Sequence, residues 1–186
     1  MTVSISKTEI TELPNDIRIS TELSIASTPL KSLPKGLDLP FCYLAYTEVS
    51  ELPVNLRIFG DLEIRDNPLK SLPSGLFVQG DLTLDNTQVT ELPGDLRVLR
   101  SLKIKECPIT SLPSGLTVNT LELVSTEISE LPNDLNIGCS LYVMDTPIRE
   151  LPSGLKVSGE LYIEGTEVRQ IPPSMLNGES YEVTLE

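Results

Sequence analysis

Residues 82–93, LTLDNTQVTELP, form one copy of a short unit that recurs along the chain. A second copy, LYIEGTEVRQIP, occupies residues 161–172 and keeps the same residue types at the same positions. Self-similarity at a fixed short period is typical of a solenoid, in which each repeat forms one coil. A Leu-Pro or Ile-Pro step closes each unit, and its prolines recur every 19 or 20 residues at Pro14, Pro34, Pro53, Pro73, Pro93, Pro113, Pro132, Pro152 and Pro172.

The hydrophobic pattern predicts one strand per unit. Leu161 and Ile163 alternate with Tyr162, so the two apolar side chains share one face of an extended segment. The Leu-Pro step that follows cannot be a central strand or a helix interior, because proline lacks the amide donor. We therefore expect an extended or 3₁₀-like return segment after each strand, and ten parallel strands in about nine coils. The core of one coil is predicted to contain Leu82, Leu84, Val89, Leu92, Leu96 and Val98.

One polar position is retained inside each coil, and a short side chain there can bond backbone groups left unpaired where the strand turns. Cysteine replaces the usual threonine at Cys107 and replaces a core leucine at Cys42, so both thiols are interpreted as structural. The column consists of Thr8, Thr28, Thr47, Asn67, Thr87, Cys107, Thr126, Thr146 and Thr166.

Composition excludes several classes of protein. The 186 residues contain no histidine, which removes Ser-His-Asp chemistry and His-ligated zinc. Three cysteines without a C-x-x-C pair argue against a disulfide framework and favour a reducing compartment. The net charge of −13 opposes binding to a nucleic-acid backbone. No apolar run is long enough for a membrane span and no signal peptide is visible, so we expect a cytoplasmic location, with signal-independent secretion left open.

In register, the unit reads L-x-[IL]-x-x-T-x-[IV]-x-x-L-P, and this pattern resembles the leucine-rich repeat family. The bacterial short type, with a period of about 20 residues and found in type III secreted effectors, is the most similar. The resemblance covers residues 2–186. It implies one array over residues 1–186, a curved rod with a parallel sheet on its concave face, little or no helix, and a closing strand at 181–186.

The spacing between units departs from the family in one respect. Most units carry one extra residue before the strand, and this residue often comes with glycine, as at Gly60, Gly80 and Gly159. The extra residue predicts a convex corner that is more like a β-helix than in family members.

The resemblance also implies that a partner protein binds on the outward side chains of the strands. Aromatic residues and methionine on a polar face are typical interface anchors, although tyrosine is also favoured in strands for packing alone. Alternation predicts one patch near the C-terminal end, a second near the N-terminal end that also includes Ala45, and a charged stretch between them. The candidate partner-binding residues are Tyr142, Tyr162, Met144 and Val124, then Tyr43, Tyr46 and Phe41, then Arg65, Lys103 and Lys105.

Several functions remain open at this point. The first is a non-enzymatic protein-binding module of bacterial or phage origin, acting as an effector, inhibitor or adaptor. The second is an acidic decoy that imitates nucleic acid and blocks a basic surface, and a third is a structural or assembly protein. An enzyme would have only carboxylates to use, and no pair of them stands out from the repeat. We expect no cofactor, no metal, no direct nucleic-acid binding and no membrane partner, and we expect homodimerisation through an uncapped end of the solenoid.

Overall fold

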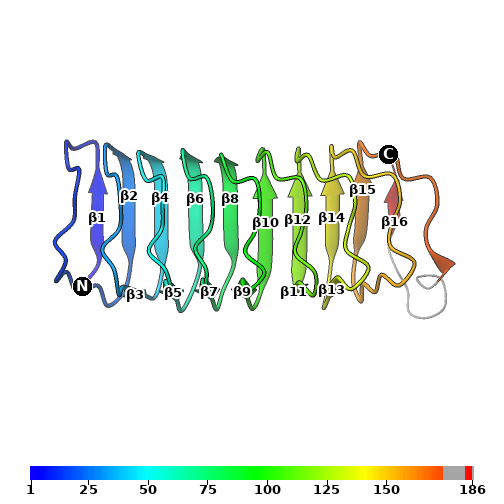
Figure 1. Ribbon diagram of the computed structural model, residues 1–186, viewed down its shortest axis with the longest axis horizontal. Coiled ribbons are helices and arrows are strands. Elements are labelled where there is room, and N and C mark those ends of the chain that lie inside the picture. The colour runs from blue at the N-terminus through cyan, green and yellow to red at the C-terminus, as the bar shows by residue number, and fades with distance from the viewer. Residues whose placement is uncertain (174–182, 186) are drawn as a thin grey trace.

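The chain forms a stack of coils, each contributing one strand to a ten-stranded parallel sheet (Figure 1). The structure is a computed structural model, which describes residues 1–173 and the backbone of 183–185. It contains no α-helix within those residues. The predicted repeat solenoid, with one parallel strand from each coil, is therefore confirmed.

The strands of the large sheet follow one another in chain order, and every neighbouring pair is parallel. Equivalent residues of successive coils lie side by side in the sheet, as Leu62 does with Leu82 and Ile64 with Leu84. Of the predicted closing strand 181–186, the structure describes Val183–Leu185 as a strand, and residues 181, 182 and 186 lie outside the described residues. The ten strands are β1 (Val3–Ser6), β2 (Leu23–Thr28), β4 (Cys42–Thr47), β6 (Leu62–Asn67), β8 (Leu82–Thr87), β10 (Ser101–Lys105), β12 (Thr120–Val124), β14 (Leu141–Met144), β15 (Leu161–Glu164) and β16 (Val183–Leu185).

A second set of short strands runs along one corner of the coils, at the lower edge of Figure 1. Its six strands have two residues each and pair in parallel in two groups, one of four strands and one of two, so the predicted β-helix-like corner is present. The glycine before some long strands permits this packing, since a Cβ on Gly60 would lie 2.3 Å from the Pro40 carbonyl oxygen. The short strands are β3 (Asp38–Leu39), β5 (Arg57–Ile58), β7 (Phe77–Val78), β9 (Arg97–Val98), β11 (Thr117–Val118) and β13 (Asn136–Ile137).

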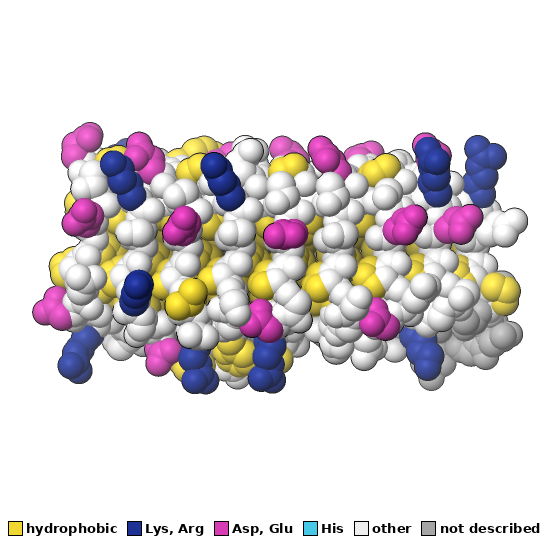
Figure 2. All heavy atoms as spheres, in the orientation of Figure 1, with side chains coloured by type: hydrophobic (Ala, Val, Ile, Leu, Met, Phe, Trp, Pro, Cys, Tyr) yellow, Lys and Arg dark blue, Asp and Glu magenta, His cyan; other side chains and the backbone are white. Residues whose placement is uncertain are grey.

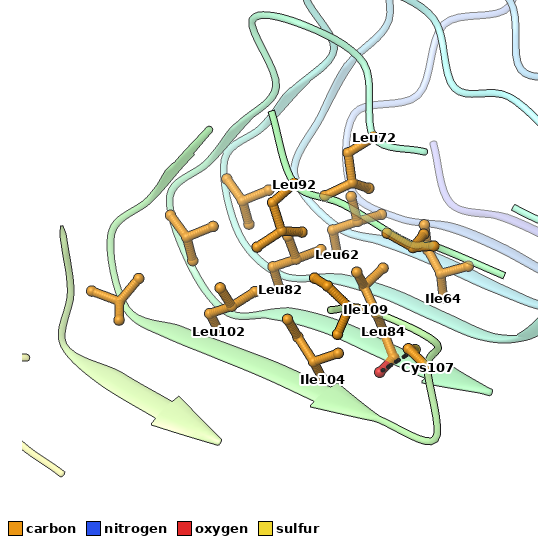
Figure 3. Close-up of a cluster of buried hydrophobic side chains, with 14 of the residues drawn as sticks. Leu62, Ile64, Leu72, Leu82, Leu84, Leu92, Leu102, Ile104, Cys107 and Ile109 are labelled. Atoms are coloured by element: carbon orange, nitrogen blue, oxygen red, sulfur yellow. Dashed lines mark hydrogen bonds between the residues drawn. The ribbon is translucent and has the colours of Figure 1, made fainter. Parts of the chain in front are cut away.

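The core consists of aligned columns of aliphatic side chains (Figure 3). Leu82, Leu84 and Val89 are fully buried, and their equivalents in neighbouring coils stack directly upon them. Leu96 differs from the prediction because it is only partly buried against this core. Each coil thus buries its apolar residues mainly against the coils on either side, as a stacked repeat requires.

The return segments are irregular rather than 3₁₀-helical. A single i→i+3 hydrogen bond follows the Leu-Pro step, as from the Leu96 amide to the Pro93 carbonyl at 3.1 Å. The same bond joins Leu155 to Pro152 at 3.0 Å. One such turn reverses the chain direction, and the next short corner strand begins directly afterwards.

The polar column is buried in the inner coils, but its hydrogen bonds differ in part from the prediction. Thr47 accepts a backbone hydrogen bond from Val49 at 3.4 Å. It also accepts one from the Asn67 amide group at 2.6 Å, so contacts between coils compete with local ones. Thr87 and Cys107 likewise contact each other at 3.2 Å. The hydroxyls of Thr28, Thr126 and Thr146 have no hydrogen-bond partner among the described residues.

Candidate functional site

The outward side chains of the large sheet form straight columns because the strands are in register. In the middle column Glu63 lies beside Thr83, and Thr83 beside Lys103. The same column continues through Glu122 to Tyr142. Neighbours in a column are about 4.8 Å apart along the rod, which brings residues 20 positions apart into contact.

The two C-terminal tyrosines lie side by side on β14 and β15. The rings of Tyr142 and Tyr162 have centroids 6.4 Å apart and planes inclined at 40°. The register places Met144 next to Val124 on one side and Glu164 on the other. The structure therefore brings Tyr142, Tyr162, Met144 and Val124 together as one patch, which we call the tyrosine patch.

Each of these phenols is held by a carboxylate. The Tyr142 hydroxyl donates to Glu160, and the Tyr162 hydroxyl donates to Glu164 over 2.6 Å. The hydrogen bond to Glu160 raises the pKa of Tyr142 above its usual value, because ionisation would place two negative charges together. Both rings are half-buried, so the hydrogen bonds fix rings that still present part of their surface to solvent.

The three cations of the central stretch are all engaged in ion pairs. Arg65 contacts Glu63 on its own strand and Asp85 on the next, the latter over 2.8 Å. The hydrogen bond to Glu63 raises the pKa of Arg65. Lys105 pairs with Glu122 over 2.8 Å.

Lys103 pairs with Asp81 over 3.0 Å. Burial disfavours the ionised Asp81, but hydrogen bonds from Lys103 and Ser101 outweigh it and lower the Asp81 pKa. A shallow depression of about 270 Å³ lies among these charges, with Thr83 at its floor. Arg65, Lys103 and Lys105 are consequently members of a balanced network rather than free positive groups.

Sequence reasoning missed Asp81 and Glu160, which hold Lys103 and Tyr142 respectively. Both residues directly precede the first core leucine of their strands. Extending the strand alternation by one step toward the N-terminus would have placed them on the outward face. Their pairing across coils depends on side-chain reach, which the alternation alone does not supply.

The N-terminal aromatic residues differ in exposure. Phe41 and Tyr43 are half-buried, whereas Tyr46 is 62% exposed at the end of β4. A hydrogen bond to Asp66 raises the pKa of Tyr46. Ala45 is fully buried, so its prediction as part of an exposed patch is wrong: its short side chain lies between Ala26 and Arg65 in the sheet and does not reach the surface.

The described residues offer no metal centre. No three His, Cys, Asp or Glu side chains gather within the ranges 1–173 and 183–185 as a metal ion would require. Burial raises the pKa of Cys42 to about 12, and burial also raises that of Cys107, which suits packing rather than nucleophilic chemistry. Within the same ranges, no helix is long and apolar enough to cross a bilayer.

The register, the aligned core and the paired outward columns together define a repeat solenoid that displays one face of a long parallel sheet. No family model matches the chain, and no curated protein matches it. Among solved structures, YopM from Yersinia enterocolitica WA-314 is similar, with 23% sequence identity and a TM-score of 0.49. The match covers 95% of this chain and 44% of that one, so this chain spans less than half the length of that structure.

Proposed function

We propose that this chain is a non-enzymatic protein-binding module that binds a partner protein through the exposed face of its large sheet. The observation that carries the proposal is the pair Tyr142 and Tyr162, with ring centroids 6.4 Å apart and each phenol hydrogen-bonded to a carboxylate. Tyrosines are frequent interface anchors. Rings that are already ordered lose little side-chain entropy when a partner binds.

The remaining candidate residues have different parts in this proposal. Met144 and Val124 extend the tyrosine patch as apolar contacts, and Phe41, Tyr43 and Tyr46 offer a second, weaker contact area. Arg65, Lys103 and Lys105 would select a partner by its charge pattern. A charge of the partner that finds no opposite charge on this face would be buried without a pair in the complex. We thus expect the two tyrosines to contribute more to the binding free energy than the other candidate residues.

An acidic decoy is the second candidate, favoured by the net charge of −13. Figure 2 shows acidic side chains repeated along the rod, and the glutamates before the Leu-Pro step are exposed. Against this function, the sheet face carries cations interspersed with its carboxylates. A surface that imitates nucleic acid would be uniformly negative where it binds.

The two candidates predict opposite results for two sets of variants. The partner is first obtained by affinity purification with the 186-residue chain and identified by mass spectrometry. Binding through the sheet face predicts that Tyr142→Ala or Tyr162→Ala weakens affinity by about 2 kcal/mol, roughly thirtyfold, with little change in melting temperature. Charge reversal at Glu51 or Glu91 should mainly alter the association rate and its salt dependence.

An acidic decoy would instead tolerate the loss of either tyrosine, and removing three or four carboxylates would abolish its binding. Measuring both sets against one partner at two salt concentrations separates the candidates. Tyrosine variants that bind as tightly as the parent would refute the proposed role of the tyrosine patch.

A bacterial or phage origin, a cytoplasmic location and a single array over residues 1–186 belong to the same proposal, whereas a structural or assembly protein is a separate alternative. Homodimerisation through an exposed strand edge is proposed with it, because an unpaired strand edge offers hydrogen-bonding groups to a second copy. Analytical ultracentrifugation that detects only monomer at tens of micromolar would rule out the dimer.

A further inference from the structure

Three consecutive corner strands present an alternating set of arginine and phenylalanine side chains. The register aligns Arg57, Phe77 and Arg97 on β5, β7 and β9. Each guanidinium carbon lies 5.7 Å from the centroid of the Phe77 ring. Arg57 also lies 5.4 Å from the ring of Phe59. We call Arg57, Phe59, Phe77, Arg97 and the nearby Leu99 the arginine–phenylalanine patch; dark blue side chains flank hydrophobic ones at this lower edge in Figure 2.

The two arginines differ from the other cations described above. Arg57 and Arg97 are exposed and form no ion pair with any residue that the structure describes, whereas Arg65, Lys103 and Lys105 are all paired. Acidic side chains outnumber basic ones by 27 to 14 in this chain, so carboxylates for such pairs are plentiful. Arg57 lies next to Asp38 in the strand register, but no ion pair joins the two residues. Two cations beside an aromatic ring that no ion pair neutralises can bind an anion from outside.

The chemistry of the patch fits carboxylates. Each guanidinium has a planar set of donors that matches a carboxylate in two parallel hydrogen bonds. The strand spacing places Arg57 and Arg97 about 10 Å apart, which is two intervals of about 4.8 Å. The side chains of Phe59 and Leu99 are 44% and 50% exposed, so they offer apolar contact beside the charges.

The same geometry disfavours a nucleic acid. Arginines on both neighbouring strands lie over the Phe77 ring, so a base finds no free ring face on which to stack. The positive surface is also short: Asp38 adjoins Arg57 on one side, and the uncharged Thr117 follows on the next short strand beyond Arg97. A longer polyanion would extend beyond the patch onto a molecule of net charge −13.

We propose that the arginine–phenylalanine patch is a second binding surface, which takes an acidic peptide segment with two carboxylates about 10 Å apart. The two anions pair with Arg57 and Arg97, and an apolar side chain of the segment packs on Phe59 or on Leu99. This surface lies on the short corner strands β5, β7 and β9 and is separate from the tyrosine patch.

The test uses the full chain and fluorescence anisotropy. The probe is a labelled hexapeptide with glutamates at its second and fifth positions, which lie on the same side and about 9 Å apart in the polyproline II conformation. The same peptide with glutamines and a labelled hexathymidylate serve as reference probes. The double variant Arg57→Gln with Arg97→Gln should bind the acidic peptide at least tenfold more weakly than the parent. Phe77→Leu, which keeps an apolar side chain, should bind it several-fold more weakly.

A matched control separates local pairing from general charge. Arg149→Gln with Arg169→Gln removes the same two positive charges elsewhere and should change the affinity less than twofold. Tyr142→Ala should bind the peptide as the parent does, so failure here and failure of the sheet-face function are distinguishable. The proposal is overturned if the glutamine peptide binds equally well, if hexathymidylate binds more tightly, or if both double variants lose the same affinity.

Discussion

One residue in each coil adopts a left-handed backbone conformation just after the outward strand positions. The φ angles lie between 46° and 61° from Lys7 to Gly165, and only the last of these residues is glycine. Such a conformation costs roughly 1–2 kcal/mol for an ordinary residue. The sharp bend it produces turns the following threonine position inward, so the cost is offset by core packing. The column consists of Lys7, Ser27, Tyr46, Asp66, Asn86, Glu106, Ser125, Asp145 and Gly165.

The buried side chain of Leu84 gives a direct test of the core assignment. Leu84→Asp places an unpaired charge in a fully buried site and should lower the free energy of unfolding by several kcal/mol. Thr83→Asp is the matched control, because residue 83 faces outward in the next position and lies beside Lys103. Thermal unfolding should show a large loss for the first variant and a small change for the second; equal melting temperatures would contradict the assignment.

The hydrogen bond between Tyr142 and Glu160 predicts a dependence on alkaline pH. The folded-state pKa of Tyr142 is raised, so its contribution to stability is present below the ordinary pKa of about 10 and is lost as pH rises through the folded value. Tyr142→Phe lacks this contribution, so its stability deficit relative to the parent should shrink at high pH. Melting curves of the parent and of Tyr142→Phe, measured below and above the pH at which Tyr142 ionises, test whether the difference in stability shrinks.

Glu160→Gln provides the control for that titration. The neutral amide removes the carboxylate that disfavours tyrosinate, so ultraviolet titration should show one tyrosine ionising at lower pH than in the parent. An unchanged titration curve would show that Glu160 does not set the Tyr142 pKa.

At the scale of elements, the long strands of the large sheet and the short strands at the corner restrict the amino-acid sequence differently. The long strands tolerate any outward side chain, whereas the corner strands approach each other so closely that Gly60 and Gly80 have no room for a Cβ. Gly80 also donates its amide to the Gly60 carbonyl over 2.8 Å, which continues the ladder around the corner. The corner therefore limits sequence variation more than the outward face of the large sheet does.

Gly60→Ala tests this close approach. The new Cβ would lie 2.3 Å from the Pro40 carbonyl oxygen, so the corner strands must separate, at a cost of about 1–3 kcal/mol. Gly94→Ala is the control, because no atom lies within 4 Å of its added Cβ. Chemical denaturation should show a lower midpoint for the first variant alone. A parent-like midpoint in Gly60→Ala would mean that the corner is more open than described.

Periodic features could be predicted from the sequence, and features that depend on side-chain reach could not. The alternation of Leu82 and Leu84 predicted the strand, and the recurring Leu-Pro step predicted the coil. The ion pair between Lys103 and Asp81 joins residues of different columns in adjacent coils, so no single unit contains the signal. The burial of Ala45 could not be predicted either, because the alternation assigns this residue to the outward side and does not show that its short side chain fails to reach the surface.

At the scale of the whole molecule, charge and coil stacking act against each other. A net charge of −13 produces self-repulsion over a compact rod, while each coil is held mainly by its two neighbours. The local ion pairs on the sheet face reduce the repulsion only there.

Added salt should therefore stabilise the fold. Raising ionic strength from about 0.01 M to about 0.15 M shortens the screening length from roughly 30 Å to roughly 8 Å, which weakens long-range repulsion more than contact pairs. The melting temperature of the parent should rise over this range. A variant with Glu51, Glu91 and Glu130 changed to glutamine should show a smaller rise, and a parent whose melting temperature falls with salt would contradict this balance.

The hydrogen bonds of both ladders run along the rod from coil to coil, and this orientation has a mechanical consequence. A force that pulls the two ends apart breaks the hydrogen bonds between two neighbouring coils before it breaks those at the next boundary. We expect single-molecule stretching to show a series of small, evenly spaced steps rather than one cooperative rupture. Each released coil of 20 residues would lengthen the chain by about 60 Å, given ~3.4 Å per extended residue less the coil spacing of ~4.8 Å. The coils would then unfold one after another at similar forces.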